Sequence, residues 1–68
     1  MKRTMQLVAI LLATYNGEKY IEEFLISLQG QTFQNYICYI HDDGSRDRTR
    51  RIAEEFEKRD PGHFQILE

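Results

Sequence analysis

The sequence predicts an α/β protein in which the elements follow the order β-α-β-α-β and the strands form a parallel, open sheet. Short runs of apolar and β-branched residues alternate with two longer segments in which apolar residues recur at helical spacing. Glycine, proline, asparagine and aspartate gather at the junctions between these segments. Helical connections between successive strands make the strands parallel, and nearly all such crossovers are right-handed. With 68 residues, the chain is one small domain or a part of a larger one.

The first strand is predicted at residues 7–13, a continuous apolar run. Such a run, apolar at every position, is typical of a parallel strand that is covered on both faces. Lys2 and Arg3 imitate the charged start of a secretory signal, but the apolar run is short and no small-residue cleavage site follows it. The run is also too short for a membrane-spanning helix, which needs about 20 apolar residues. We therefore interpret it as a strand.

The first helix is predicted after the polar break at residues 14–17. Asn16 is placed to cap the start of this helix, and Gly30 is placed to end it. Five apolar residues recur at the spacing of one helix face and are expected to point inward. They are Tyr20, Ile21, Phe24, Leu25 and Leu28.

The second half of the chain repeats the pattern. A strand is predicted at residues 36–40, and Ser45 or Asp47 can cap the helix that follows. Pro61 and Gly62 end this helix, and Phe64 begins a third strand. The inward face of the second helix is predicted to consist of Thr49, Ile52, Ala53 and Phe56.

A candidate site lies where the first two strands end. Parallel strands share one carboxyl edge, and open α/β sheets bind ligands there. The first strand delivers residues 14–16 to this edge and the second delivers residues 41–45. Tyr15 can be a platform for a nucleobase, and Asp42 and Asp43 can accept hydrogen bonds or hold a divalent cation. The structural alternative is a tyrosine packed over the strand ends and an acidic turn that caps the second helix.

Composition excludes several classes of function. The net charge of −2 gives no attraction to nucleic acid. Cys38 is the only cysteine, which excludes an intrachain disulfide or a multi-cysteine zinc site and fits a reducing compartment. Cys38 lies mid-strand and is predicted to be a buried, inert thiol. The glycine-rich phosphate-binding motifs of dinucleotide-binding and P-loop proteins are absent.

One face of the predicted sheet is expected to be bare. Right-handed crossovers in a single direction place both helices on the same face. The continuously apolar first strand nevertheless implies cover on both faces in the working protein. We therefore expect the chain to self-associate or to need cover from residues after Glu68.

Three motifs in combination carry a family resemblance. They are T-Y-N-G-x-x-Y at residues 14–20, S-L-x-x-Q-T at residues 27–32 and D-D-G-S-x-D-x-T at residues 42–49. Over about residues 7–67 the chain closely resembles the beginning of the family 2 glycosyltransferases. The resemblance implies the amino-terminal part of a Rossmann-like GT-A fold, in which the first half binds the nucleotide of an activated sugar donor. It implies that Tyr15 stacks on or flanks a uracil or thymine ring and that Asp43 hydrogen-bonds the base. Residues implied to shape the same pocket are Thr14, Asn16, Glu18 and Asp42.

The resemblance also implies what the parent protein does. It would move a sugar from a UDP- or dTDP-linked donor to a saccharide or lipid-linked acceptor hydroxyl, in cell-envelope polysaccharide biosynthesis. A divalent cation, Mg or Mn, would assist in the complete enzyme. The metal-binding D-x-D and the catalytic base of the family lie beyond the third strand, so we expect no catalytic or metal-binding residue in this chain, weak nucleotide affinity and no turnover.

Two finer details of the resemblance concern the basic stretch after the acidic turn and the exit of the first strand. The basic stretch at residues 46–51 is similar to rhamnosyltransferase-like members and points to a dTDP-linked donor. Ala13 stands where many relatives have proline, which loosens the strand exit without disturbing Tyr15 or the acids. The expected location is the cytoplasm or the inner face of the membrane.

Two other classes of function remain as alternatives. One is a stand-alone α/β binding or assembly module without catalysis. The other is a phosphoryl-transfer domain of receiver type, which also gathers acids at a parallel sheet edge. The receiver reading fits poorly, because its acidic pair would follow the first strand rather than the second.

Overall fold

The computed structural model describes residues 6–68, so Lys2 and Arg3 lie outside the described residues. Its five elements follow the predicted order and confirm the α/β class. The second strand runs to Asp42, two residues further than predicted. The elements are β1 (Val8–Thr14), α1 (Glu18–Gln29), β2 (Tyr36–Asp42), α2 (Thr49–Arg59) and β3 (Phe64–Leu67).

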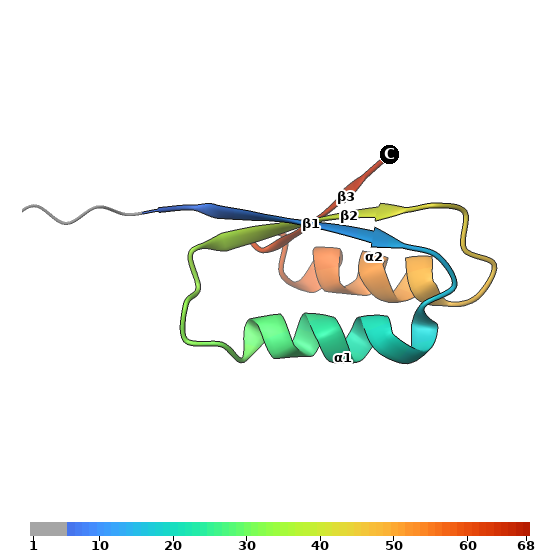
Figure 1. The fold of residues 1–68 in the computed structure, drawn as a ribbon, viewed down its shortest axis with the longest axis horizontal. Helices are drawn as coiled ribbons and strands as arrows, with labels where there is room; N and C mark the ends of the chain where they lie inside the picture. The colour runs from blue at the N-terminus through green and yellow to red at the C-terminus, as the bar shows by residue number, and fades with distance from the viewer. Residues whose placement is uncertain (1–5) are drawn as a thin grey trace, which may run out of the picture.

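The three strands form one parallel sheet in the order β1-β2-β3. Val8 pairs with Tyr36 at one end of the β1–β2 ladder, and Thr14 pairs with Asp42 at the other. Both helices lie on the same face of the sheet (Figure 1), as right-handed crossovers in one direction require. The register therefore brings the carboxyl ends of β1 and β2 to the same point of the sheet edge.

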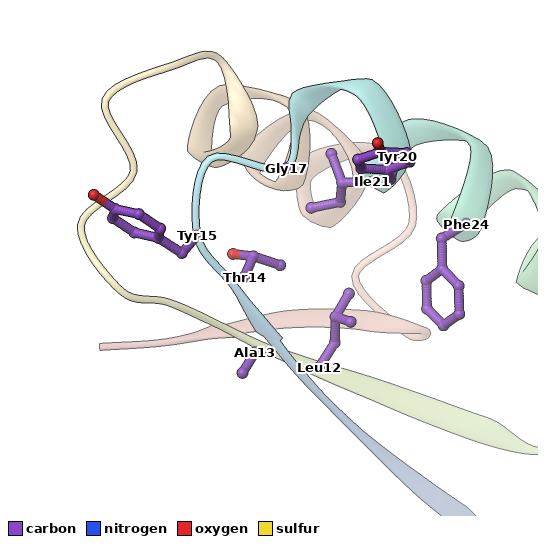
Figure 2. Close-up of a pocket in the computed structure, with 8 residues that line it drawn as sticks. All are labelled: Leu12, Ala13, Thr14, Tyr15, Gly17, Tyr20, Ile21 and Phe24. Atoms are coloured by element: carbon purple, nitrogen blue, oxygen red, sulfur yellow. The ribbon is translucent and has the colours of Figure 1, made fainter.

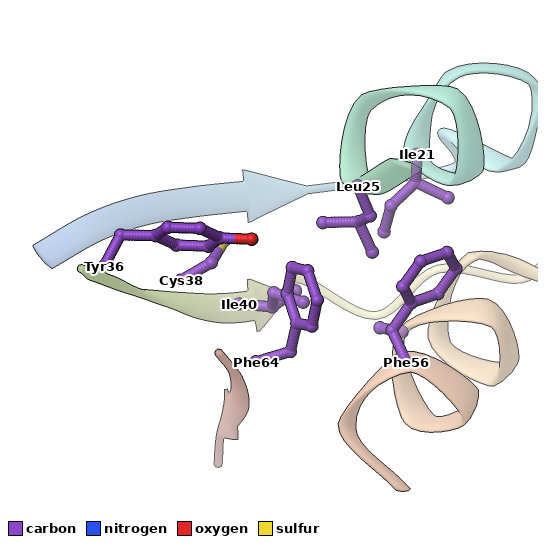
Figure 3. Packing of buried hydrophobic residues seen from close by; sticks show 8 residues of the cluster. Ile21, Leu25, Tyr36, Cys38, Ile40, Phe56 and Phe64 are labelled. Atoms are coloured by element: carbon purple, nitrogen blue, oxygen red, sulfur yellow. The ribbon is translucent and has the colours of Figure 1, made fainter. Parts of the chain in front are cut away.

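The core lies between the sheet and the two helices (Figure 3). Phe64 is fully buried and packs edge-to-face against Phe56, with ring centroids 5.5 Å apart, and against Tyr36 at 6.3 Å. Cys38 is also fully buried, and this burial raises the pKa of its thiol to about 11. The prediction of a buried thiol in mid-strand is confirmed.

The predicted inward face of α1 is wrong at two positions. Ile21 and Leu25 are buried, but Tyr20 is 73% exposed and Phe24 is 40% exposed. The reason is that β1 is an edge strand, and no described element lies beyond it to cover this flank of α1. The inward face of α2 is as predicted, with Thr49, Ala53 and Phe56 buried and Ile52 partly buried.

The face of the sheet away from the helices is bare, as predicted. Leu11, in the middle of β1, is 78% exposed, and Leu67 in β3 is 43% exposed. Their neighbour His41 is exposed on the same face, because side chains alternate along each strand and His41 pairs with Leu67. An apolar surface therefore remains without a partner among the described residues.

His63 joins the amino-terminal ends of β2 and β3. Its Nδ1 lies 3.0 Å from Oδ2 of Asp60, its Nε2 lies 2.9 Å from the carbonyl oxygen of Gln34, and its ring stacks on Tyr36 with centroids 4.3 Å apart. Both ring nitrogens face acceptors, so only the protonated imidazolium donates a hydrogen bond to each. The hydrogen bonds to Gln34 and to Asp60 raise the pKa of His63.

We expect the free energy of unfolding to fall as the pH rises through the pKa of His63 in the folded protein. A group whose pKa is higher in the folded than in the unfolded state stabilises the fold fully below its unfolded pKa, and this stabilisation disappears as the pH rises through the folded value. The midpoint of urea unfolding, followed by circular dichroism, should therefore be lower at about pH 8.5 than at about pH 6.

Two single substitutions test the origin of this pH dependence. His63→Ala should remove most of it, because the alanine cannot bond Asp60 or Gln34. His41→Ala changes the exposed histidine and should retain it. A wild-type midpoint that rises with pH over this range would contradict the expectation.

Candidate functional site

The ends of β1 and β2 are joined directly at the carboxyl edge of the sheet. The hydroxyl of Thr14 donates to Oδ1 of Asp42 at 2.6 Å, and the amide of Asp43 donates to the carbonyl oxygen of Thr14 at 2.9 Å. The segments that follow, residues 15–17 (the β1 loop) and residues 43–48 (the β2 loop), are therefore neighbours although about thirty positions separate them. The predicted convergence of these two segments is confirmed.

Hydrogen bonds cross from each loop to the other. The amide of Asn16 donates to Oγ of Ser45 at 2.8 Å, and the amide of Arg46 donates back to Oδ1 of Asn16 at 2.8 Å. Asn16 has a positive φ of 50°, so its backbone occupies the left-handed region that asparagine tolerates. Its side chain bonds the opposite loop, and the prediction that Asn16 caps α1 is wrong: the N-cap residue is Gly17.

The backbone amides at the amino-terminal ends of the two helices also donate hydrogen bonds to side chains from the other half of the chain. The amide of Glu18, the first residue of α1, donates to Oδ2 of Asp47 at 3.2 Å. In return, the amide of Arg48, the N-cap of α2, donates to Oε1 of Glu18 at 3.1 Å. Helix ends leave amides without helical partners, and here Asp47 of the β2 loop accepts at the start of α1 and Glu18 of α1 accepts at the start of α2.

Asp42 organises the turn that follows β2. Its carboxylate accepts from the amide of Ser45 at 2.9 Å and from the Ser45 hydroxyl at 2.5 Å, in addition to Thr14. Partial burial acts to raise the pKa of Asp42, but the hydrogen bonds from Ser45 and Thr14 outweigh it and lower the pKa. Gly44 has a φ of +76°, which an L side chain rarely adopts, and so allows the tight turn.

Tyr15 and Asp43 remain available to a ligand. Tyr15 is 61% exposed, and Asp43 is exposed as well. The hydrogen bonds among residues 6–68 engage neither the Tyr15 hydroxyl nor the Asp43 carboxylate, whereas Thr14, Asn16 and Asp42 use their side chains to join the loops. The site thus presents a free aromatic ring and a free carboxylate on a mutually braced pair of loops.

A cavity of about 300 Å³ lies beside this site, between β1 and α1 (Figure 2). Of the six residues predicted for the nucleotide pocket, Thr14 and Tyr15 line the cavity, but Asn16, Glu18, Asp42 and Asp43 do not. Sequence reasoning missed the cavity because it placed Tyr20 and Phe24 in the core. The lining residues are Leu12, Ala13, Thr14, Tyr15, Gly17, Tyr20, Ile21 and Phe24.

Metal ligands do not gather in the part of the chain that the structure describes. Within residues 6–68, no group of three or more His, Cys, Asp or Glu residues is arranged to hold a metal ion. The Asp42 carboxylate accepts hydrogen bonds within the turn, and His41 lies exposed on the bare face of the sheet. Over the same residues, no helix has the length and apolar character needed to cross a bilayer.

A parallel α/β unit with polar and aromatic side chains gathered at the carboxyl edge of its sheet belongs to a class of folds that binds ligands at that edge. Comparison with protein families shows which family of this class the chain belongs to. The model of glycosyl transferase family 2 matches residues 9–68, and the chain belongs to this family.

Several curated bacterial proteins are similar to the chain. It is 47% identical over 60 residues to the putative glycosyltransferase EpsH of Bacillus subtilis, which covers 88% of this chain and 17% of that protein. It is 45% identical over 56 residues to the dTDP-rhamnosyl transferase RfbG of Shigella flexneri, covering 82% of this chain and 19% of that protein. The chain therefore spans less than a fifth of the length of these relatives. No solved structure matches the chain.

Proposed function

We propose that this chain is the nucleotide-binding part of a glycosyltransferase that transfers a sugar from a nucleotide diphosphate donor to an acceptor hydroxyl. One observation carries the proposal: Tyr15 and Asp43 are free at the carboxyl edge of the sheet, while the residues around them are engaged in bracing the loops. Membership of glycosyl transferase family 2 supports the reaction class.

The chemistry of the two free side chains suits a pyrimidine base. A base stacked on an aromatic side chain gains about 1–3 kcal/mol. A carboxylate only accepts hydrogen bonds, and uracil and thymine each offer one imide N–H as a donor. Tyr15 would therefore hold the base by its face, and Asp43 would select a base that carries an imide. The similarity to a dTDP-rhamnosyl transferase favours a dTDP-linked donor over a UDP-linked one.

The other four predicted residues act indirectly in this proposal. Each of them hydrogen-bonds another protein group between the two halves of the site, so they would shape the site by fixing the positions of the two loops. These residues are Thr14, Asn16, Glu18 and Asp42. Their side chains would not be the first contacts of the base.

Sugar transfer itself would need groups that residues 6–68 do not bring together. The described residues do not fit a divalent cation, because no cluster of three or more ligating side chains forms among them. We propose that the Mg or Mn ion, the catalytic base and the saccharide or lipid-linked acceptor act in the longer protein, in the cytoplasm or at the inner face of the membrane. The 68-residue chain would then bind nucleotide weakly without turnover.

Titration with UDP and dTDP, followed by NMR, tests the proposal. We expect saturable shifts of the Tyr15 ring and the Asp43 amide at nucleotide concentrations of about a millimolar, which corresponds to about 4 kcal/mol of binding free energy. Tyr15→Ala and Asp43→Asn should each weaken binding by about tenfold. Tyr20→Ala removes a similarly exposed tyrosine from α1 and should leave the affinity unchanged.

The outcomes distinguish the competing functions. A loss of affinity in Tyr20→Ala, with Asp43→Asn unaffected, would place the ligand in the cavity, which Tyr20 lines and Asp43 does not. An absence of chemical-shift changes in the wild-type chain at several millimolar nucleotide would favour the second candidate, an assembly module without catalysis. The bare apolar face around Leu11, which is 78% exposed, is the observation that favours that candidate.

A further inference from the structure

Asp47 lies in the β2 loop, and its carboxylate accepts hydrogen bonds at the starts of both helices. Its Oδ2 accepts from the amide of Glu18 at 3.2 Å, at the start of α1. Its Oδ1 accepts from the amide of Thr49 at 2.9 Å and from the Thr49 hydroxyl, at the start of α2. A single carboxylate thus bonds the first residues of both helices, and each helix start carries partial positive charge that a negative group complements.

The bonds around Asp47 extend to the β1 loop. The Thr49 hydroxyl, which donates to Asp47, accepts from the amide of Gly17 at 2.7 Å. The amides of Gly17 and Glu18, two and three residues after Tyr15, are therefore held by one connected pair of side chains. On its other side Tyr15 follows Thr14, whose hydroxyl is bound to Asp42. The backbone that carries the Tyr15 ring is anchored both before and after the ring.

The protonation state of Asp47 agrees with this arrangement. Desolvation acts to raise the pKa of Asp47, but the hydrogen bonds from the Thr49 hydroxyl, the Thr49 amide and the Glu18 amide lower it. The carboxylate is ionised at neutral pH and can accept from all three donors at once. An asparagine at this position keeps the shape but has one acceptor oxygen, so it cannot serve both helix starts through two acceptor atoms.

We infer that Asp47 is a positioning residue: it sets the place of the Tyr15 ring relative to Asp43 by joining the β1 loop to the β2 loop. This inference rests on the proposed function, in which a nucleotide base contacts Tyr15 and Asp43. Asp47 itself, with its oxygens bonded to Glu18 and Thr49, acts on the base only through the loops.

The test compares three single substitutions in the full chain, with and without nucleotide. In Asp47→Asn, we expect the Glu18 amide to exchange its hydrogen about tenfold faster, the Tyr15 ring resonances to shift and the affinity for UDP or dTDP to fall by about tenfold. In Asp43→Asn, the affinity should fall while the exchange of the Glu18 amide stays at the wild-type rate.

Asp60→Asn is the matched control for general destabilisation. Asp60 lies at the other end of α2, where it bonds His63. Its substitution should lower the unfolding midpoint, yet leave the Tyr15 ring resonances and the nucleotide affinity unchanged. A purely structural role of Asp47 predicts the same behaviour for Asp47→Asn as for Asp60→Asn.

Failure of the inference is distinct from failure of the proposed function. An Asp47→Asn chain with wild-type exchange at Glu18, or with faster exchange but unchanged Tyr15 resonances and affinity, overturns the positioning role. A wild-type chain that binds neither nucleotide overturns the proposed function. In that case the exchange of the Glu18 amide and the Tyr15 resonances, both measured without ligand, still decide whether Asp47 positions the ring.

Discussion

The Phe64→Ala substitution should lower the free energy of unfolding by about 3–5 kcal/mol, the range for truncating a buried phenylalanine. Phe64 is fully buried in β3 and packs edge-to-face against Phe56 from α2 and Tyr36 from β2 (Figure 3). Removing the ring leaves a cavity between the sheet and α2. A chain of this length typically has about 3–10 kcal/mol of stability in total, so much of the variant should be unfolded.

Circular dichroism during urea unfolding measures this effect, and Phe33→Ala supplies the control. Phe33 is 49% exposed in the connection between α1 and β2, so the same chemical change should cost much less there. Equal unfolding midpoints for the two variants would mean that β3 does not complete the core.

The Thr49→Val substitution should lower the free energy of unfolding by about 1–3 kcal/mol, the cost of leaving a buried polar group without its partner. Thr49 is fully buried, and its hydroxyl accepts from the amide of Gly17 and donates to Asp47. Valine has nearly the same shape but neither accepts nor donates. The loss of stability therefore measures the contribution of the hydroxyl rather than that of the packing.

Two controls isolate the hydroxyl in the same urea unfolding experiment. Thr49→Ser retains the hydroxyl and should recover most of the stability that valine loses. Thr32→Val makes the same change at an exposed threonine and should stay within about 0.5 kcal/mol of the wild type. A Thr49→Val chain as stable as the wild type would show that the bond to Gly17 contributes nothing.

The order of the elements along the chain and the parallel direction of the strands could be predicted because local patterns indicate them. Residues 7–13 are apolar without interruption, and the two helices show clear apolar periodicity, so the parallel direction of the strands follows from the helical connections between them. The same reasoning brought Tyr15 and Asp43 to one edge of the sheet. The register confirms this meeting, because Thr14 and Asp42, which directly precede them, are partners.

The details of the site could not be predicted because they depend on contacts between distant residues. Capping rules consider the residues next to a helix start, which is why they predict Asn16 as the cap of α1. In the structure its side chain bonds Arg46, thirty positions away. Periodicity predicts Tyr20 in the core because it identifies an apolar face, but it does not say how much of that face a three-stranded sheet can cover.

The start of each helix is bonded by an acid from the other half of the chain, Asp47 for α1 and Glu18 for α2. This arrangement has a consequence for how the chain acquires its structure during synthesis. The opening turn of α1 needs Asp47 and Thr49, and these residues leave the ribosome about thirty positions after Gly17. A nascent chain that ends before residue 47 therefore lacks the acceptors for the amides of Gly17 and Glu18. The start of the first helix should consequently remain frayed until Asp47 and Thr49, which follow the second strand, have docked, so that both halves become ordered in one cooperative step.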